Sequence, residues 1–287
     1  MAITIGNSSV RDIYLGNSKV NSVFLGDVLV YGNLANDPED TYNKFVFDTS
    51  KATSSIQPVV TLQDYRAGDT THWNGYTDWG DGTVNKELSH RYTTSGIYTV
   101  KTKYMINDSD GNSDTDTDTL FIRCDAINKN IRDLSYLFYE CNNLTSINLS
   151  NLDKSLYYKA EYAFYRTSYS TDIAQYELDL SGLKLSGSVS HMFGYNNGIG
   201  TLNLSGFDMT KAINTSYMFF NEFGDVFTPI DNIILNGCSD DNIIKIVPLL
   251  GEKRLTSGEI SWGGSIYVDE IKSTYPTPKD GWTYKTK

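Results

Sequence analysis

The densest group of side chains that could bind a metal ion is an acidic run between residues 107 and 118. It alternates Asp with Ser, Thr, Asn and Gly, and carboxylate oxygens are ligands that Ca²⁺ prefers. An EF-hand loop requires Asp-x-Asp-x-Asp-Gly with a later Glu, whereas counting back five residues from Gly111 places Ile106 at the first ligand position. We interpret the run as a solvated hairpin turn, with a weak calcium site as the alternative.

Histidine and nucleophile chemistry has no recognisable arrangement in the chain. His72, His90 and His191 do not pair at metal-ligand spacing, and no Ser or Cys has a nucleophile-elbow signature. Paired carboxylates carry no weight as glycosidase evidence in a chain with 35 acidic residues. We therefore expect a non-enzymatic protein without a cofactor or a catalytic metal. His90 is expected to be a structural hydrogen-bonding residue and His191 a satisfied turn residue.

The three cysteines, Cys124, Cys141 and Cys238, show no spacing typical of disulfide pairs, and an odd number cannot close a complete disulfide framework. Unpaired cysteines usually pack as small apolar residues. We expect free, buried thiols.

The net charge of -11 argues against polyanionic partners, because nucleic-acid backbones and anionic membrane surfaces repel an acidic protein. No apolar run approaches the roughly 18 residues that a membrane-spanning helix needs. Residues 1–6 lack the basic and apolar segments of a secretory signal. We expect no nucleic-acid binding and no membrane insertion. If the protein acts at a surface, we expect either a route other than ordinary secretion or a sequence from which a signal has been trimmed.

An aromatic turn followed by an alternating strand recurs through the C-terminal half of the chain. The turns are centred, at nearly constant spacing, on Phe138, Phe164, Phe193 and Phe219. The strand-like segments that follow them lie at residues 147–150, 178–181, 202–205 and 233–236. A motif that returns in fixed order is typical of a stacked repeat array. We predict a solenoid over residues 125–287, with a further strand at 259–262 and residues 281–284 as a cap.

Residues 144–152, Leu-Thr-Ser-Ile-Asn-Leu-Ser-Asn-Leu, together with the Met-Phe turns at Met192 and Met218, resemble the leucine-rich repeats of bacterial surface proteins of the BspA type. The resemblance covers residues 131–287. It implies a leucine-rich-repeat-like solenoid.

Two polar ladders are expected on the outer face of these strands, because inward leucines place their neighbours outward. One ladder contains Ser146, Glu177, Thr201, Asn232 and Glu259, and the other contains Asn148, Asp179, Asn203, Ile234 and Ser261. Strands about 4.8 Å apart would give a polar strip on the order of 20 Å long. Such a strip suits a glycan or a protein edge, and its candidate contact residues are Ser146, Asn148, Asp179, Thr201 and Asn203. The alternative is an ordinary solvated face, because neither ladder contains an aromatic residue.

Tyrosines outside these strands are a second candidate surface, because Tyr offers a large contact area at low entropic cost. We divide them between such a surface and the core; they are Tyr157, Tyr158, Tyr162, Tyr165, Tyr169 and Tyr195.

Residues 41–124 contain candidate strands at 44–47, 58–62, 98–104 and 119–123. Between them lie Asp-Trp-Gly-Asp-Gly-Thr at 78–83, Ser-His-Arg-Tyr at 89–92 and Gly-Ile-Tyr-Thr-Val at 96–100. Gly80 and Gly82 permit a tight turn that Asp81 can cap, and Trp79 and Tyr98 can fill a core between two sheets. These motifs resemble the polycystic-kidney-disease (PKD) family, which implies an immunoglobulin-like β-sandwich.

Residues 1–32 repeat a short strand and a Gly-Asn or Gly-Asp turn at intervals of ten residues. A segment this small buries too little apolar surface to offset the entropy that it loses on folding. It must therefore pack against the next domain or against another protein. The second alternative makes it a docking segment that adds strands to a partner through Ile13, Tyr14, Leu15, Phe24 and Leu25. Its Ile-Tyr-Leu-Gly-Asn units resemble N-terminal repeats of phage tail and virion proteins. Residues 33–40 are expected to be a linker.

The sequence therefore predicts a mainly β, multidomain protein and leaves two functions open. In one, it is a structural protein of a phage head or tail fibre, assembled in the host cytoplasm. It would dock to other virion proteins through residues 1–32 and display the solenoid to a host-surface glycan or protein. In the other, it is a bacterial cell-surface adhesin with a PKD-like spacer. The ten-residue repeat is compatible with a homo-oligomer, and the position in the particle is open.

Overall fold

The computed structural model describes the backbone of residues 13–15, 18–20, 22–25 and 28–32, and both backbone and side chains of 41–52, 58–62, 76–104, 120–167, 175–196, 198–219, 230–251, 264–278 and 282–286. Within these ranges the protein is mainly β. The expected linker at 33–40, His72, the acidic run at 107–118, Tyr169 and the expected strand at 259–262 lie outside the described residues.

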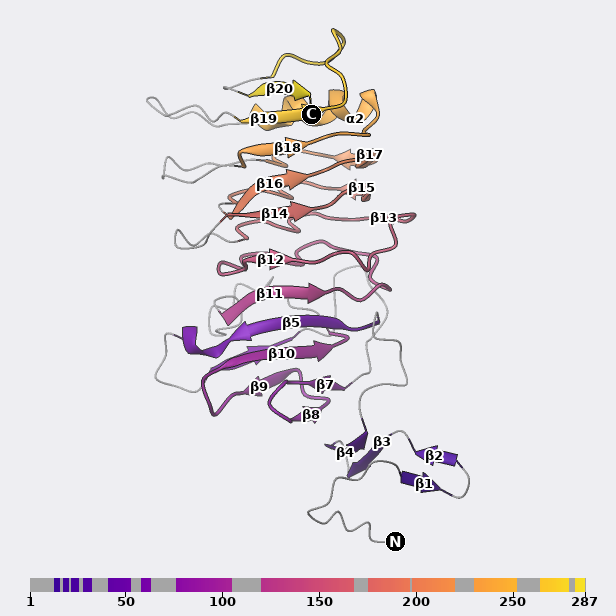
Figure 1. The fold of residues 1–287 in the computed structure, drawn as a ribbon, viewed down its shortest axis with the longest axis vertical. Helices are drawn as coiled ribbons and strands as arrows, with labels where there is room; N and C mark the ends of the chain where they lie inside the picture. Colours follow the sequence, from indigo (N-terminus) through magenta and orange to yellow (C-terminus); the bar gives the residue numbers. More distant parts are fainter. Residues whose placement is uncertain are drawn as a thin grey trace.

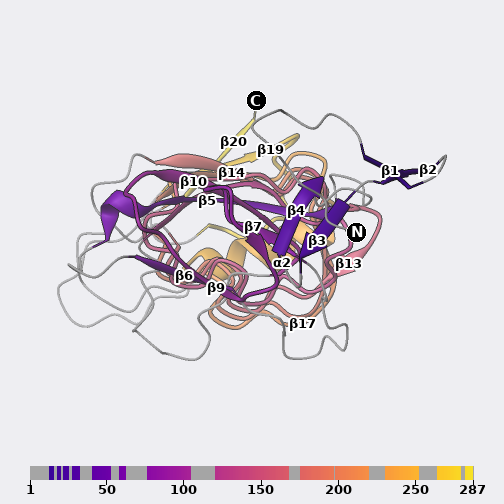
Figure 2. The same cartoon turned by 90° about the horizontal axis from the view of Figure 1, so that it is seen from below.

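Residues 41–126 form a region of two strand layers. The larger layer contains β5 (Asn43–Asp48), β7 (Thr77–Asp78), β8 (Val84–Asn85), β10 (Ile97–Thr102) and β11 (Phe121–Ala126), hydrogen-bonded in the order β11-β5-β10-β7-β8. The second layer is the antiparallel pair β6 (Val59–Thr61) and β9 (Ser89–Arg91). Figure 2, viewed along the molecule, shows this pair on the opposite side from β5 and β10. The strands overlap all four segments predicted in this part of the sequence.

The core of the two-layer region is built around Trp79, which is fully buried. Its indole Nε1 donates to Asn85 Oδ1 at 2.9 Å, and its carbonyl accepts from the Tyr92 hydroxyl at 2.8 Å. Tyr98 was expected in this core, but it is only partly buried and stacks on Tyr92 with a 4.2 Å centroid distance. The reason is its hydroxyl, which reaches out to the Thr94 carbonyl.

The turn after Trp79 has the predicted glycine chemistry. Gly80 and Gly82 have φ of 81° and 93°, and the Thr83 N–H donates to Asp81 Oδ1 at 2.9 Å. A Cβ on Gly80 would lie 2.7 Å from the Thr99 carbonyl oxygen, so only glycine fits there. His90 Nε2 lies 2.7 Å from Asp81 Oδ2, which confirms its structural role.

Residues 127–286 form a stack of parallel strands above the two-layer region (Figure 1). One sheet of this stack contains β14 (Tyr176–Asp179), β16 (Ile199–Asn203), β18 (Asn232–Ile234), β19 (Ser265–Val268) and β20 (Thr283–Thr286), in that order and all parallel. A short α-helix, α2 (Asp240–Ile246), packs near the C-terminal end of this stack.

A second parallel sheet covers the other side of the stack. It contains β13 (Tyr157–Tyr158), β15 (Lys184–Ser188) and β17 (Asp208–Asn214). These strands were not predicted, because they contain Lys, Ser and Gly and do not alternate cleanly between apolar and polar residues. Leu185 and Met209 are their buried anchors.

The strand stack and the two-layer region share one apolar core. β11 pairs antiparallel with β5 and also parallel with β12 (Ser146–Ile147), the first strand of the stack. Stacked Phe rings continue the connection from Phe121 through Phe138, Phe164 and Phe193 to Phe219, with centroid distances between 5.2 and 6.3 Å. The core therefore runs unbroken from Phe45 to Trp282.

The cysteines and the N-terminal strand pairs agree in most respects with the sequence expectations. Cys124 and Cys141 are buried and not in disulfides, as expected, whereas Cys238 is also outside any disulfide but only partly buried, because it follows the turn at Gly237. In the N-terminal segment, β1 (Ile13–Leu15) pairs with β2 (Ser18–Val20), and β3 (Ser22–Leu25) pairs with β4 (Val28–Gly32). Both pairs are antiparallel, as the repeated turns predicted. The docking candidates Ile13, Tyr14 and Leu15 form β1, and Phe24 and Leu25 lie in β3.

Candidate functional site

The first candidate surface is the outer face of the sheet that runs from β14 to β20. Its strands bring Glu177, Thr201, Asn232, Ser265 and Thr283 into one ladder, and Asp179, Asn203, Ile234, Tyr267 and Lys285 into a second. The contact candidates Asp179, Thr201 and Asn203 are thus adjacent. Ser146 lies in β12 and Asn148 directly follows this strand, whose hydrogen-bonded neighbour is β11.

The residues that follow Asn232 and Ile234 in the two ladders differ from the sequence expectation. The strand after β18 is β19, so Ser265 and Tyr267 stand where Glu259 and Ser261 were expected. The second ladder therefore contains an aromatic residue, Tyr267, whereas no aromatic residue was expected in either ladder. The Lys285 ammonium lies 5.9 Å from the Tyr267 ring centroid. The C-terminal end of the face consequently combines an aromatic ring with a cation.

Three of the contact candidates use their side-chain oxygens inside the fold. Asn148, Asp179 and Asn203 each accept a hydrogen bond from the backbone N–H two residues later, at 3.0, 2.9 and 3.1 Å. Such Asx turns end the strand and satisfy the following backbone. Asn148 also donates through Nδ2 to the Asp125 carbonyl at 3.0 Å. These residues therefore hold the strand ends in place whether or not a ligand binds.

The second candidate surface is an aromatic edge at the turns that carry the Phe residues. We define the aromatic edge as Tyr136, Tyr139, Tyr162, Tyr165, His191 and Tyr217. Tyr136, Tyr162, His191 and Tyr217 each stand two residues before a Phe of the core, and they form one column. Tyr136 and Tyr162 stack at 5.1 Å and 12°, Tyr162 and His191 at 4.6 Å and 5°, and His191 and Tyr217 contact at 5.1 Å and 33°.

A second column of rings lies beside the first. Tyr139 and Tyr165 stack at 5.2 Å and 7°, and both meet the ring of Tyr162 at about 65°. All of these side chains are partly exposed, and Tyr217 is 49% exposed. The aromatic edge is therefore a regular two-column array whose rings keep contact with solvent.

The backbone at the aromatic edge is in the left-handed region. Tyr136, Tyr162, His191 and Tyr217 have φ between 54° and 59°. An L-residue in this conformation costs roughly 1–2 kcal/mol, whereas glycine adopts it freely. An aromatic contact contributes about 0.5–1.5 kcal/mol beyond its buried area. The two effects are of similar size. Glu140, Arg166 and Tyr195, four residues farther along the same turns, also have positive φ, so the left-handed backbone is a property of the repeated turn.

Charged side chains around the aromatic edge are matched within the protein. Arg166 Nη1 lies 3.0 Å from Glu140 Oε1, and the Ser188 hydroxyl donates to Glu161 Oε1 at 2.9 Å. Burial and the nearby Glu161 raise the pKa of Tyr136 and Tyr162, so both hydroxyls stay protonated at neutral pH. Burial lowers the pKa of His191 although Glu161 opposes this effect, so its imidazole is neutral there. The rings of the aromatic edge are thus uncharged and carry hydrogen-bond donors, while the Glu161 carboxylate beside them is hydrogen-bonded to Ser188.

Sequence reasoning found part of this surface. It named Tyr162 and Tyr165, but it missed Tyr136, Tyr139 and Tyr217 and treated His191 only as a turn residue, whose Nδ1 does hydrogen-bond to Ser190 Oγ at 2.7 Å. The available signal was the aromatic residue two positions before each repeated Phe. Among the other named tyrosines, Tyr158 and Tyr195 are buried, and Tyr157 is partly exposed with Lys211 Nζ 3.8 Å from its ring centroid.

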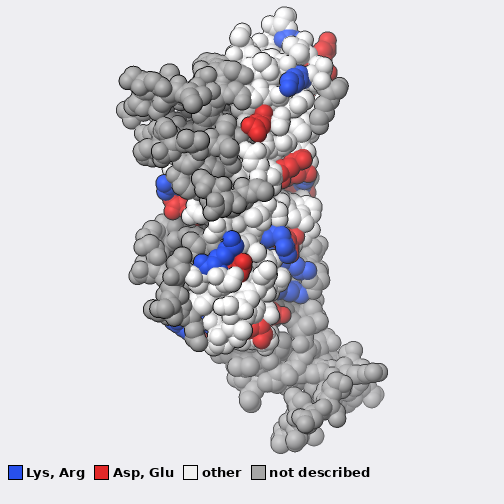
Figure 3. Space-filling view, turned by 60° about the vertical axis from the view of Figure 1, so that its left-hand side comes forward, with Lys and Arg blue, Asp and Glu red and all other residues white. Residues whose placement is uncertain are grey.

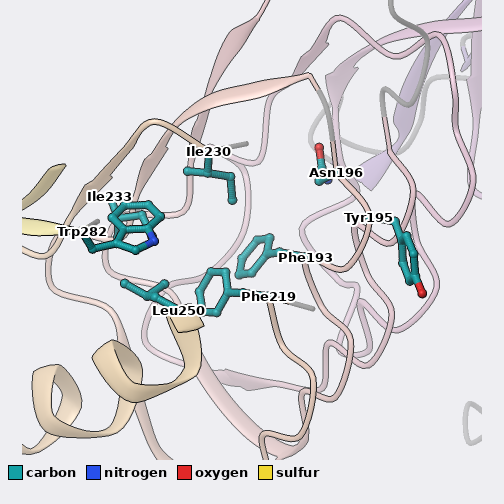
Figure 4. A pocket seen from close by; sticks show the side chains of 8 residues that line it. All are labelled: Phe193, Tyr195, Asn196, Phe219, Ile230, Ile233, Leu250 and Trp282. Atoms are coloured by element: carbon teal, nitrogen blue, oxygen red, sulfur yellow. The ribbon is translucent and has the colours of Figure 1, made fainter. Parts of the chain in front are cut away.

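A small cavity lies inside the C-terminal end of the stack (Figure 4). It measures about 20 Å³ and is lined by Phe193, Phe219, Leu250 and other apolar residues. Asn196 and Trp282 also belong to its lining, and Asn196 Oδ1 and Trp282 Nε1 have no hydrogen-bond partner among the residues that the structure describes. Tyr195 points away from it in Figure 4. The space holds about one water molecule and no larger ligand.

The remaining surface offers no alternative centre of chemistry in the described ranges. Figure 3 shows acidic and basic side chains scattered among uncharged residues on one face. No group of three metal-binding side chains occurs in the part of the chain that the structure describes. Over the same residues, no helix has the length and apolar character required to cross a bilayer.

Comparisons with models of protein families, with curated proteins and with solved structures find no match for this chain.

Proposed function

We propose that this chain is a non-enzymatic structural protein of a phage particle, of the head or tail fibre type, that displays a repeat domain to the host surface. The observation that carries the proposal is the row of in-register parallel strands with an outward polar face. An extended scaffold of this kind presents side chains at regular intervals, which suits recognition of a repetitive surface.

The proposed architecture has three parts. Residues 1–32 dock onto other virion proteins, residues 41–124 are a PKD-like β-sandwich that acts as a spacer, and residues 125–287 are a leucine-rich-repeat-like solenoid. The buried Trp79, the glycine turn after it and the Asp81–His90 contact support the second part. The parallel sheets and the continuous Phe ladder support the third.

The proposed partner of the displayed part is a host-surface glycan or protein. Asp179, Thr201 and Asn203 lie side by side on the polar face, and Tyr267 adds an aromatic ring farther along it. The net charge of -11 supports a neutral or cationic partner.

Deletion of residues 1–32 tests the docking role. The truncated chain is expected to be lost from purified particles while keeping its melting temperature. Truncated protein that co-sediments with particles at full occupancy would refute docking. Full-length protein found on bacterial envelopes and absent from particles would favour the adhesin alternative. Loss of host attachment in the Asn148→Ala and Asn203→Ala variants would assign the contact to the polar face.

A further inference from the structure

We propose that the aromatic edge, rather than the polar face, binds the displayed protein's ligand, and that this ligand is an uncharged, extended glycan chain. The inference rests on the proposed display function and names the residues and the ligand class. It follows from the period, the backbone and the charge of the aromatic edge.

The period of the aromatic edge fits a sugar chain better than a peptide. Successive rings of the first column are 4.6 to 5.1 Å apart. This is close to the length of one pyranose unit in an extended polysaccharide. A β-strand repeats its side chains on one face only every two residues, at about 6.7 Å, and would lose register after one or two contacts. A glycan laid along the stack can instead place one sugar beside each ring.

The orientation of the rings determines which atoms meet the ligand. Rings stacked at 5° to 12° cover one another's faces, so solvent reaches their edges and their hydroxyl groups. The ligand is therefore recognised by hydrogen bonds from the phenol hydroxyls of Tyr136, Tyr162 and Tyr217, with the His191 imidazole between the last two and the ring edges as apolar contacts. Hydroxyl-rich sugars supply an acceptor at each step.

The backbone strain supports a role for these side chains beyond folding. The positions of Tyr136, Tyr162, His191 and Tyr217 all have positive φ, where glycine would be unstrained, and Glu140, Arg166 and Tyr195 in the same turns share this conformation. Strained positions that recur on one surface are typical of functional sites. On the polar face, Asn148, Asp179 and Asn203 do not have positive φ, and their side chains are used in Asx turns.

The charge pattern determines the glycan class. Glu140 is paired with Arg166, and Glu161 accepts from Ser188, so the aromatic edge itself offers no cation to an acidic sugar. Removing water from an unpaired carboxylate would oppose binding of uronic or sialic acids. Neutral hexose chains carry no such penalty.

The test is affinity electrophoresis of the full chain in gels that contain a soluble polysaccharide. Glucomannan, hydroxyethylcellulose and dextran are the neutral probes, and alginate is the acidic probe. We expect retardation by at least one neutral probe and none by alginate. A chain that no neutral probe retards, or that alginate retards most strongly, would overturn the proposal.

Variants that remove only hydroxyl groups locate the site. The triple variant Tyr136→Phe, Tyr162→Phe, Tyr217→Phe keeps the stacked rings, and we expect its affinity to fall about tenfold because three hydrogen bonds are lost together. The matched control is Tyr267→Phe on the polar face, which should bind within about twofold of the parent. Circular dichroism and melting temperature verify that both variants fold.

The outcomes separate this inference from the proposed function. If Tyr267→Phe or Asn203→Ala weakens binding and the triple variant does not, the glycan lies on the polar face. The inference is then wrong and the display function stands. If the triple variant weakens binding to the isolated protein but host attachment of particles is unchanged, the site is confirmed and the display function fails.

Discussion

Replacing Phe164 by alanine should weaken both halves of the structure at once. The ring of Phe164 is fully buried and stacks between Phe138, at 5.5 Å, and Phe193, at 5.6 Å. Truncation of a buried Phe to Ala costs about 3–5 kcal/mol, because apolar area is lost and a cavity remains. Total stabilities are about 5–15 kcal/mol, so the variant should stay folded with a melting temperature lower by about 10 °C.

Guanidinium denaturation and hydrogen exchange measure the effect. Ile213→Ala is the control, because Ile213 is 87% exposed and its truncation should change the free energy of unfolding by less than about 0.5 kcal/mol. Since one core runs from Phe45 to Trp282, amides of β10 and β18 should lose protection together in Phe164→Ala. Loss of protection in β18 alone, with β10 unchanged, would show that the two-layer region is independently stable and that the shared core does not couple them. A cost below about 1 kcal/mol would refute the packing argument itself.

Two further predictions concern the turn after Trp79. Gly80→Ala should lower the free energy of unfolding by more than about 2 kcal/mol, whereas Gly82→Ala should lower it by only about 1 kcal/mol. Both glycines have positive φ, but only at Gly80 would the added Cβ lie 2.7 Å from a backbone oxygen, that of Thr99. Equal losses of unfolding free energy for the two variants in chemical denaturation would contradict the close contact at Gly80. Burial acts to raise the pKa of Asp81, but hydrogen bonds from Thr83 and His90 outweigh it, and the net pKa is lowered. The carboxylate therefore stabilises the fold above its unfolded pKa of about 4, and this contribution should disappear as the pH falls through the lower folded pKa. Melting temperatures between about pH 5 and pH 2 should decline less steeply in Asp81→Asn than in the parent, and parallel curves would refute this assignment.

The sequence predicted the elements whose residues leave a strong local pattern. The segment 44–47 contains a run of three apolar residues, and 98–104 alternates in part between apolar and polar residues. The two glycines at 80 and 82 are typical of a tight turn with positive φ. The strand at Lys184–Ser188 escaped prediction because its partners on both sides come from distant repeats, and the sheet rather than local propensity makes it a strand.

The residues of the candidate surfaces could also be predicted only in part from the sequence. Strand register could be inferred from the repeated leucines, which placed Asp179 next to Asn203 correctly. Whether a polar side chain is available to a ligand depends on what its oxygen accepts, and the Asx turns are visible only with the backbone in place. Ring stacking at the aromatic edge likewise depends on left-handed backbone at non-glycine residues, which sequence rules disfavour.

The direction of the strands has a mechanical consequence. In Figure 1 the strands of the stack lie across the long axis of the molecule, so the hydrogen bonds between them point along that axis. A pulling force applied to the two ends would load these bonds one after another instead of shearing them together. Under tension the stack should lengthen by detaching single strands from one end, absorbing work in many small steps while the rest of the molecule keeps its shape.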